Sequence, residues 1–168
     1  ASARAFMGYM MTLPGKKLLF MGQEFGHFIE WDEKRELDWF LLQYDSHRNL
    51  HNLSRELNKF YKEHPECWEN DENWEGFQWS SCNEADRNAL AFRRIAKDGS
   101  ELLFVFNFCP NEYRGFHVEV PEDSKWEEIL STDEPRFGGS GWFPNGTRES
   151  WHEGYSNFAA VDLAPNSA

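Results

Sequence analysis

The chain has 168 residues, enough for one domain or for one small domain and part of another. Its 17 Lys and Arg residues stand against 29 Asp and Glu residues, and the resulting net charge of −12 repels polyanions. No basic cluster offsets that field, which excludes nucleic acid as a partner. The longest apolar run, residues 102–106, is far shorter than the roughly 18 residues of a membrane span.

Aromatic residues make up 17% of the chain, including 8 Trp. Aromatic rings with a polar edge suit protein cores and sugar rings alike, so a neutral sugar polymer is compatible with this composition. The three cysteines, Cys67, Cys82 and Cys109, form no Cys-x-x-Cys unit, and their odd number leaves at least one unpaired. We expect reduced thiols in a cytoplasmic protein, and the sequence indicates no cofactor.

The first 39 residues combine an apolar helical start, a short apolar segment and a polar loop. The helical start ends at Leu13-Pro14-Gly15, which is a turn signal. Residues 17–21 then form an apolar run that is closed by Gly22. Short apolar runs without alternation are typical of strands buried on both faces of a parallel α/β sheet, so a buried strand is predicted here.

A helix is predicted next, with Asp45 or Ser46 capping its first turn. Its apolar stripe recurs at three- and four-residue spacing, at Leu50, Leu53, Leu57 and Phe60. The helix should stop at His64, because the residue before a proline is disfavoured in the helical region.

From about residue 76 the pattern changes to short strands. They are expected at residues 77–81, 88–95, 101–109, 116–120, 126–130 and 158–163. The Asp98-Gly99 dipeptide marks a hairpin between the second and third of these strands. Residues 132–155, rich in Gly, Pro and Trp, are predicted to form a long loop. The spacing favours an antiparallel sandwich or barrel.

A domain boundary is therefore expected near residues 65–73. The material before it is α/β in character, and a single strand cannot bury both of its faces. We expect the partners of that strand to lie upstream of Ala1, at what reads as a cut boundary. By the same reading, apolar residues are expected to continue the chain beyond Ala168.

Several segments, in order, resemble one family of enzymes. Residues 18–26 (LLFMGQEFG) resemble the last barrel strand and following turn of the α-amylase superfamily. Glu30-Trp31 and residues 36–39 (ELDW) are similar to units found in bacterial 1,4-α-glucan branching enzymes. The β region carries further matches to that family, in the same order: residues 76–79 (GFQW), 90–94 (LAFRR), 106–108 (FNF) and 126–133 (WEEILSTD).

The resemblance implies a mainly β chain: residues 1–66 would be the end of a (β/α)8 barrel and residues 67–168 an antiparallel β-sandwich. Such enzymes cleave α-1,4 linkages and transfer the chain to a 6-hydroxyl, forming the α-1,6 branches of glycogen. This retaining chemistry needs two carboxylates about 5–5.5 Å apart. In the family these groups follow barrel strands that would lie upstream of Ala1. We therefore expect no catalytic residue in this chain, whose partners would be an α-glucan and the rest of the barrel.

Two residues are candidates for contact with sugar. Glu24 follows the predicted strand, at the end of a barrel where active sites assemble, although its carboxylate could instead tie the loop together. Trp79 could stack on glucan or belong to the core. The acidic residues of the polar loop are expected to be solvated, and no metal site is expected, although His47 and His51 share a helix face.

Two other functions fit parts of the pattern. An autonomous carbohydrate-binding β-sandwich would explain the strands and the Trp residues, but it has no need of a buried lone strand and a barrel helix. Another α-amylase-type hydrolase, debranching or trehalose-releasing, would share the barrel end, and the Leu37-Asp38-Trp39 unit favours branching.

Overall fold

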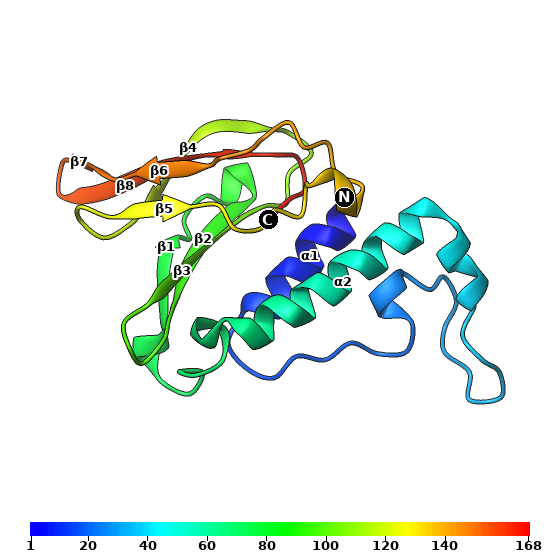
Figure 1. The fold of residues 1–168 in the computed structure, drawn as a ribbon. Helices are drawn as coiled ribbons and strands as arrows, with labels where there is room; N and C mark the ends of the chain where they lie inside the picture. Colours follow the sequence, from blue (N-terminus) through cyan, green and yellow to red (C-terminus); the bar gives the residue numbers. More distant parts are fainter.

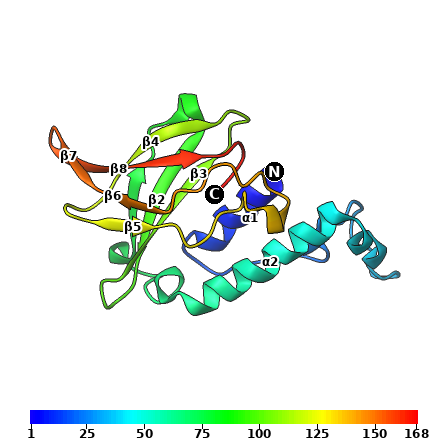
Figure 2. The same ribbon diagram turned by 45° about the horizontal axis from the view of Figure 1, so that its top comes forward.

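The computed structural model describes residues 1–168, which form a pair of helices packed beside a set of antiparallel sheets (Figure 1). Helix α1 (Ser2–Thr12) lies alongside helix α2 (Asp45–Glu63). Figure 2 shows α1 between α2 and the strands. Six short 3-10 helices complete the helical elements: η1 (Gln23–Phe25), η2 (Trp39–Gln43), η3 (Pro65–Cys67), η4 (Trp74–Gly76), η5 (Ala85–Arg87) and η6 (Pro135–Phe137).

Both helices end where the sequence predicts. Helix α1 stops at Leu13, which is extended before Pro14, and α2 stops at His64, which is extended before Pro65. The expected cap of α2 is not made. Tyr44 occupies the N-cap without a side-chain hydrogen bond, and the Asp45 carboxylate pairs with Arg48 inside the first turn instead.

The strands confirm an all-β second part. One sheet has the order β1-β2-β3 and another the order β4-β8-β7, while β5 pairs with β6; every pairing is antiparallel. The bounds are β1 (Phe77–Ser81), β2 (Ala89–Ile95), β3 (Glu101–Asn107), β4 (Tyr113–Glu119), β5 (Lys125–Glu127), β6 (Thr147–Glu149), β7 (Trp151–Glu153) and β8 (Ser156–Leu163).

The first two sheets share one core, as in a sandwich. Buried residues of β2, Ala89 and Ala91, belong to the same apolar cluster as Phe116 and Val118 of β4 and Ala159 of β8. A second cluster joins the helices to the β part. There Met7 and Met11 of α1 and Leu53 and Leu57 of α2 pack with Phe137. The stripe predicted on α2 is therefore its buried face.

The expected loop at residues 132–155 contains two strands, β6 and β7. Each has only three residues, and Gly154, with φ of +65°, turns the chain from β7 into β8. Runs this short carry too little alternation to be recognised. Strand β5 ends at Glu127 rather than continuing to residue 130. The Asp98-Gly99 hairpin is confirmed, with Gly99 at φ of +88°.

The strand expected at residues 17–21 is not formed. The segment is largely extended, but no other strand pairs with it. A strand exists through hydrogen bonds to a neighbour, and a parallel neighbour is never adjacent in sequence. The other elements place no such neighbour beside it. None of the helices combines the length and the apolar character needed to cross a membrane.

Candidate functional site

Glu24 lies in a tight turn stabilised by its own side chain. Gly22 precedes η1 with φ of +91°, and its amide donates a hydrogen bond of 3.0 Å to the Glu24 carboxylate. A Cβ at Gly22 would lie only 2.6 Å from the Cβ of His27, so the turn requires glycine on two grounds. The carboxylate thus orders the turn, and the half-buried position of Glu24 leaves part of it open to solvent.

Two histidines hold the polar loop that follows. The Nδ1 atom of His27 lies 2.8 Å from the Ile29 carbonyl, and its Nε2 accepts a hydrogen bond of 3.0 Å from the Asp38 amide. His47 of α2 is buried and binds the Phe25 carbonyl through Nδ1 at 2.8 Å. These bonds explain how a long loop adopts one conformation against the helix.

Two of the acidic residues of this loop have structural partners. Asp32 accepts a hydrogen bond from the Lys34 amide, and the carboxylate of Asp38 lies 3.4 Å from His27. His47 and His51 do not act together, because the former is committed to Phe25. No group of three or more His, Cys, Asp or Glu residues in the chain is arranged to hold a metal ion.

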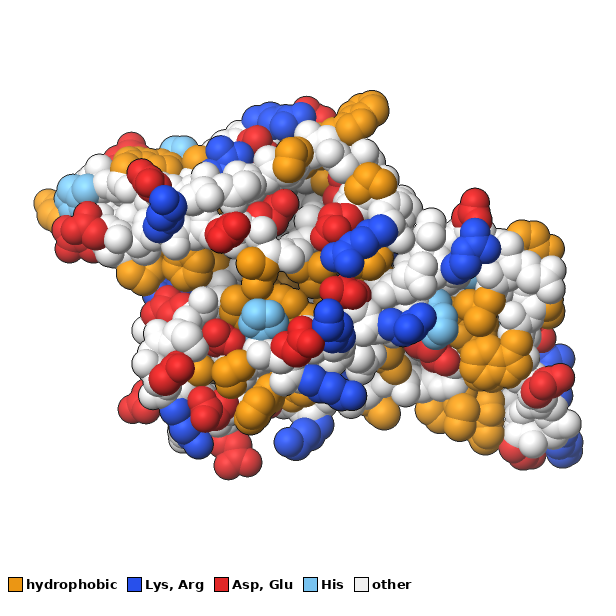
Figure 3. All heavy atoms as spheres, in the orientation of Figure 1, with side chains coloured by type: hydrophobic (Ala, Val, Ile, Leu, Met, Phe, Trp, Pro, Cys, Tyr) orange, Lys and Arg blue, Asp and Glu red, His pale blue; other side chains and the backbone are white.

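The same region exposes a series of large apolar side chains, which we call the apolar ridge: Leu18, Phe20, Met21, Phe28, Ile29, Trp31, Trp39, Phe40 and Tyr44. Figure 3 shows hydrophobic side chains gathered over the loop and the start of α2, on the right of the molecule. Leu18 is 75% exposed and Phe28 77% exposed. Exposed apolar side chains gathered in this way are typical of an interface.

Trp79 lies elsewhere, on β1. Its ring contacts Phe77 edge-on at 5.1 Å between centroids and Phe92 at 6.0 Å. Half of the residue remains exposed. Trp79 therefore belongs to the margin of an aromatic core and offers only part of its ring to a ligand. It is not brought together with Glu24.

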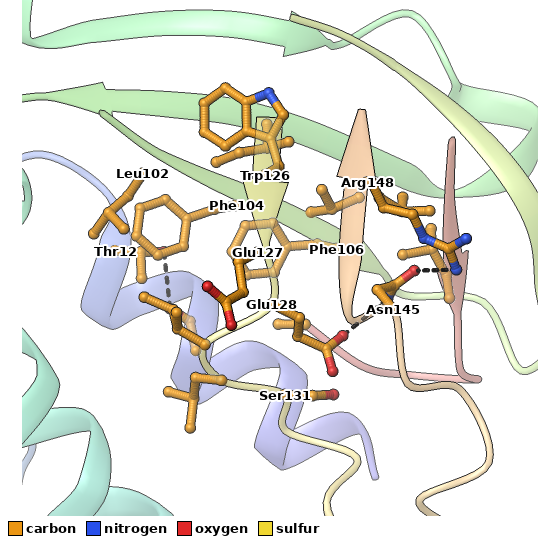
Figure 4. Close-up of a pocket in the computed structure, with 18 of the residues that line it drawn as sticks. Thr12, Leu102, Phe104, Phe106, Trp126, Glu127, Glu128, Ser131, Asn145 and Arg148 are labelled. Atoms are coloured by element: carbon orange, nitrogen blue, oxygen red, sulfur yellow. Dashed lines mark hydrogen bonds between the residues drawn. The ribbon is translucent and has the colours of Figure 1, made fainter. Parts of the chain in front are cut away.

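A cavity of about 650 Å³ opens between β3 and the chain segment of residues 125–132. We call it the β3 groove. Its lining includes Phe104 and Phe106 of β3 and, from the segment of residues 125–132, Trp126, Glu127 and Glu128 (Figure 4). Arg148 closes one end, where it is hydrogen-bonded to Asn145. The groove contains neither Glu24 nor Trp79.

The cysteines differ in their surroundings. Cys67 is buried, and desolvation raises the pKa of its thiol to about 12. Cys109 is partly exposed, and a hydrogen bond from the Asn111 backbone lowers the pKa of its thiol. All three thiols are free, and the deep burial of Cys67 makes it inert.

The β3 groove was not predicted. Its one signal in the sequence is the run of residues 102–106, which is apolar at every position. A strand with that composition is covered on both faces, and it requires more neighbours than β2 alone. The walls at Trp126 and Arg148 come from distant segments, so only the structure could bring them together.

Comparisons with known proteins agree with this architecture. Residues 79–168 match the family described as alpha amylase, C-terminal all-beta domain. A 1,4-alpha-glucan branching enzyme GlgB of Halothermothrix orenii is 46% identical over 142 residues, covering 84% of the chain and 22% of the relative.

Two other proteins of that name cover still more of the chain. The one from Oceanobacillus iheyensis is 40% identical over 170 residues, or 98% of the chain, and the one from Rhodococcus jostii is 43% identical over 176 residues, or 100% of the chain. The chain spans about a quarter of the length of these relatives, 26% and 24%. Together with its two three-stranded antiparallel sheets and their shared core, the matched residues 79–168 show that the chain belongs to the alpha-amylase C-terminal all-beta domain family.

Proposed function

We propose that the chain is a C-terminal part of a bacterial 1,4-α-glucan branching enzyme and that it carries no catalytic carboxylate. The observation that carries the proposal is the similarity to such enzymes over the full chain, at 43% identity in one case. Two acidic residues of the polar loop support the second point, since Asp32 accepts a hydrogen bond from the Lys34 amide and Asp38 lies 4.0 Å from the Arg35 guanidinium. Retaining transfer needs an acid and a nucleophile facing one substrate bond.

Residues 1–66 are proposed to complete a catalytic barrel, and residues 67–168 to form its β domain. The apolar ridge supports this division, because large apolar side chains such as Phe28 and Leu18 are costly to leave in water. An autonomous sugar-binding module would gain nothing from such a surface. In this proposal the ridge contacts the rest of the barrel, and the working compartment is the cytoplasm.

The substrate of the whole enzyme is proposed to be an α-glucan of the glycogen type. Glu24 would act at the rim of the active site by holding the turn at Gly22, and its exposed part would contact sugar. Trp79 would offer its exposed ring edge and face to a glucan bound on the β domain. No cofactor is needed for this chemistry.

A chimera tests the proposal. The 170 residues of the Oceanobacillus iheyensis enzyme that align with this chain would be replaced by the chain itself. We expect the chimera to branch amylose, measured by the loss of iodine colour and by the short chains released on debranching. Phe28→Asp in the chimera should weaken its assembly and activity, because it places a charge in the proposed interface. Trp74→Asp, at a 92% exposed residue outside the ridge, is the matched control.

A folded chimera that hydrolyses amylose without forming branches would contradict the proposal in favour of a hydrolase. Equal activity of the Phe28→Asp and Trp74→Asp chimeras would contradict the role assigned to the ridge.

A further inference from the structure

The chain contains a single asparagine that is followed by glycine, Asn145 before Gly146. In such a pair the backbone nitrogen of the glycine can attack the side-chain carbonyl carbon of the asparagine, because no Cβ blocks its approach. Gly146 is exposed, and its amide donates no hydrogen bond. The nucleophile of this reaction is therefore free.

The side-chain amide of Asn145, which the glycine nitrogen would attack, is held by four hydrogen bonds. Its Nδ2 atom donates to the Glu128 carboxylate at 2.9 Å and to the Asp162 carbonyl at 3.1 Å. Its Oδ1 atom accepts from the Asp162 amide at 2.7 Å and from the Arg148 guanidinium at 3.2 Å. Figure 4 shows the bonds to Glu128 and Arg148. This side chain ties the end of β5 and strand β6 to β8, and attack requires these bonds to open.

A carboxylate at position 145 does not fit the same partners. Conversion of Asn145 to aspartate replaces the Nδ2 donor with an oxygen, so the Glu128 carboxylate and the Asp162 carbonyl each lose a donor and face an acceptor. Arg148 offsets only part of the new charge, because its guanidinium already lies 3.4 Å from the Asp162 carboxylate. The reacted side chain therefore opposes closure of the β5–β6 sheet onto β8.

The pair Asp98-Gly99 shows the opposite arrangement. Aspartate before glycine forms the same cyclic imide, with water as the leaving group in place of ammonia. Here the Gly99 amide donates to the Ala96 carbonyl at 3.1 Å, so the hairpin holds the nucleophile. The Asp98 carboxylate accepts from the Ser100 amide at 2.9 Å and has no partner in the β5–β6 sheet. Asp98 is therefore an internal reference whose reaction does not depend on that sheet.

We propose that Asn145-Gly146 is a self-modification site that reacts only when the β5–β6 sheet opens from β8. Once the Asn145 amide is released, the Gly146 nitrogen loses its proton and forms a bond to Cγ, while the bond from Cγ to Nδ2 breaks. The Nδ2 nitrogen takes up a proton and leaves as ammonia. One water then opens the cyclic imide at either carbonyl carbon and gives aspartate or isoaspartate. Water is the sole co-reactant, and ammonia is the sole by-product.

The product acts as a latch against reclosure. Besides the new charge, an isoaspartate lengthens the backbone just before β6, which disturbs the pairing of Thr147 with Glu127. Opening then becomes irreversible, so the modified fraction records how often the sheet has opened. The inference concerns the chemistry of the chain itself and does not rest on the proposed enzyme function.

The test follows deamidation of the full chain at mildly alkaline pH, with and without urea. Trypsin releases residues 137–148 as one peptide in which Asn145 is the only asparagine, and mass spectrometry with an isoaspartate assay measures the product. We expect the folded chain to react about 100-fold more slowly than the unfolded chain, because opening must break the hydrogen bonds of Asn145. Isomerisation of Asp98 gives the reference rate in each sample.

Three variants separate this gating from general destabilisation. Glu128→Ala removes one partner of the Asn145 amide and should speed the reaction of the folded chain about 3-fold or more, without a change in urea. Glu127→Ala removes the adjacent exposed carboxylate, which makes no bond to Asn145, and should leave both rates unchanged. Gly146→Ala should slow the reaction in urea, because its Cβ hinders the nitrogen.

The substitution Asn145→Asp supplies a second arm that needs no deamidation. The backbone amides of β5 and β6 should exchange hydrogen faster in this variant than in the wild type. The proposal is overturned if folded and unfolded chains deamidate at the same rate, if the Glu128→Ala and Glu127→Ala chains react alike, or if Asn145→Asp leaves the exchange unchanged. A folded chain whose β5 and β6 amides exchange while Asn145 never reacts would overturn it as well.

Discussion

Arg94 offers the sharpest test of how the helical and β parts are joined. It lies on β2 and is fully buried. Its guanidinium donates to the Thr12 carbonyl at the end of α1 at 2.9 Å, to the Gly76 carbonyl at 3.2 Å, and to the Asp71 carboxylate. One side chain therefore connects α1, the segment before β1 and the first sheet. We consider the substitution Arg94→Met, which keeps an apolar stem of similar length.

The expected loss follows from what the substitution leaves behind. Two buried carbonyls lose their donor, and Asp71, whose side chain is 12% exposed, keeps a charge without a partner. Removing one partner of a buried ion pair typically costs about 3–5 kcal/mol. This cost is a net value that already includes the gain from no longer burying the Arg94 charge. For a chain of this size, each kcal/mol lowers Tm by about 2–4 °C, so a fall of roughly 6–20 °C is expected.

The assay is urea unfolding followed by circular dichroism, with Tm from calorimetry. Arg93→Met is the matched control, because Arg93 lies next in the same strand and also pairs with a carboxylate, that of Glu101, but this partner is 25% exposed and Arg93 donates to no backbone carbonyl, so the loss should be smaller. Adding Asp71→Asn to Arg94→Met should restore about 1–2 kcal/mol by removing the stranded charge. If Arg94→Met costs no more than Arg93→Met, or if Asp71→Asn restores nothing, the reasoning fails.

Three further predictions concern the core and the thiols. Leu57→Ala should lower the free energy of unfolding by about 2–5 kcal/mol, because Leu57 of α2 is only 3% exposed and packs in the apolar cluster shared with α1. An unchanged urea midpoint would show that α2 is not docked on its neighbours. In the native chain Cys109 should react with iodoacetamide well before Cys67, as read by mass spectrometry of the labelled peptides; simultaneous labelling would contradict their surroundings. Because burial raises the pKa of Cys67 from 9.0 to about 12, the unfolded state binds fewer protons above pH 9 and stability should fall as the pH rises. Cys67→Ala should make that fall shallower, and an identical slope would count against the assignment.

Elements defined by local signals were predictable. Helix α2 is specified by its stripe and by Pro65, and the β2–β3 hairpin by Asp98-Gly99. In these cases the sequence carries both the pattern and its terminators. Agreement at the ends of both helices follows from the same cause, the conformational restriction before a proline.

Elements that depend on partners distant in the sequence could not be predicted. Strands β6 and β7 exist because three residues of each pair with β5 and β8, and nothing within three residues announces this. The segment of residues 17–21 has the composition of a strand but finds no partner. The β3 groove depends on residues of β3 and residues 125–132 coming together, which is a property of topology.

The candidate site was only partly predictable for a related reason. The sequence indicated that Glu24 follows an apolar run, but the role of its carboxylate in holding the Gly22 turn needed coordinates. The position of Trp79 at the edge of an aromatic core likewise depends on Phe92, which lies opposite it on the neighbouring strand β2. The residue types of Glu24 and Trp79 suggested contact with sugar. The structure shows that only part of each side chain is exposed and free to make that contact.

The most direct test of the central claim is to incubate the purified 168-residue chain alone with amylose and to measure α-1,6 linkages by proton NMR of the anomeric signals. The account predicts no such linkages and no new reducing ends, because the carboxylates that perform retaining transfer are proposed to lie outside this chain. Accumulation of α-1,6 signals above a heat-inactivated control would contradict it, since a catalytic pair would then have to reside among these residues.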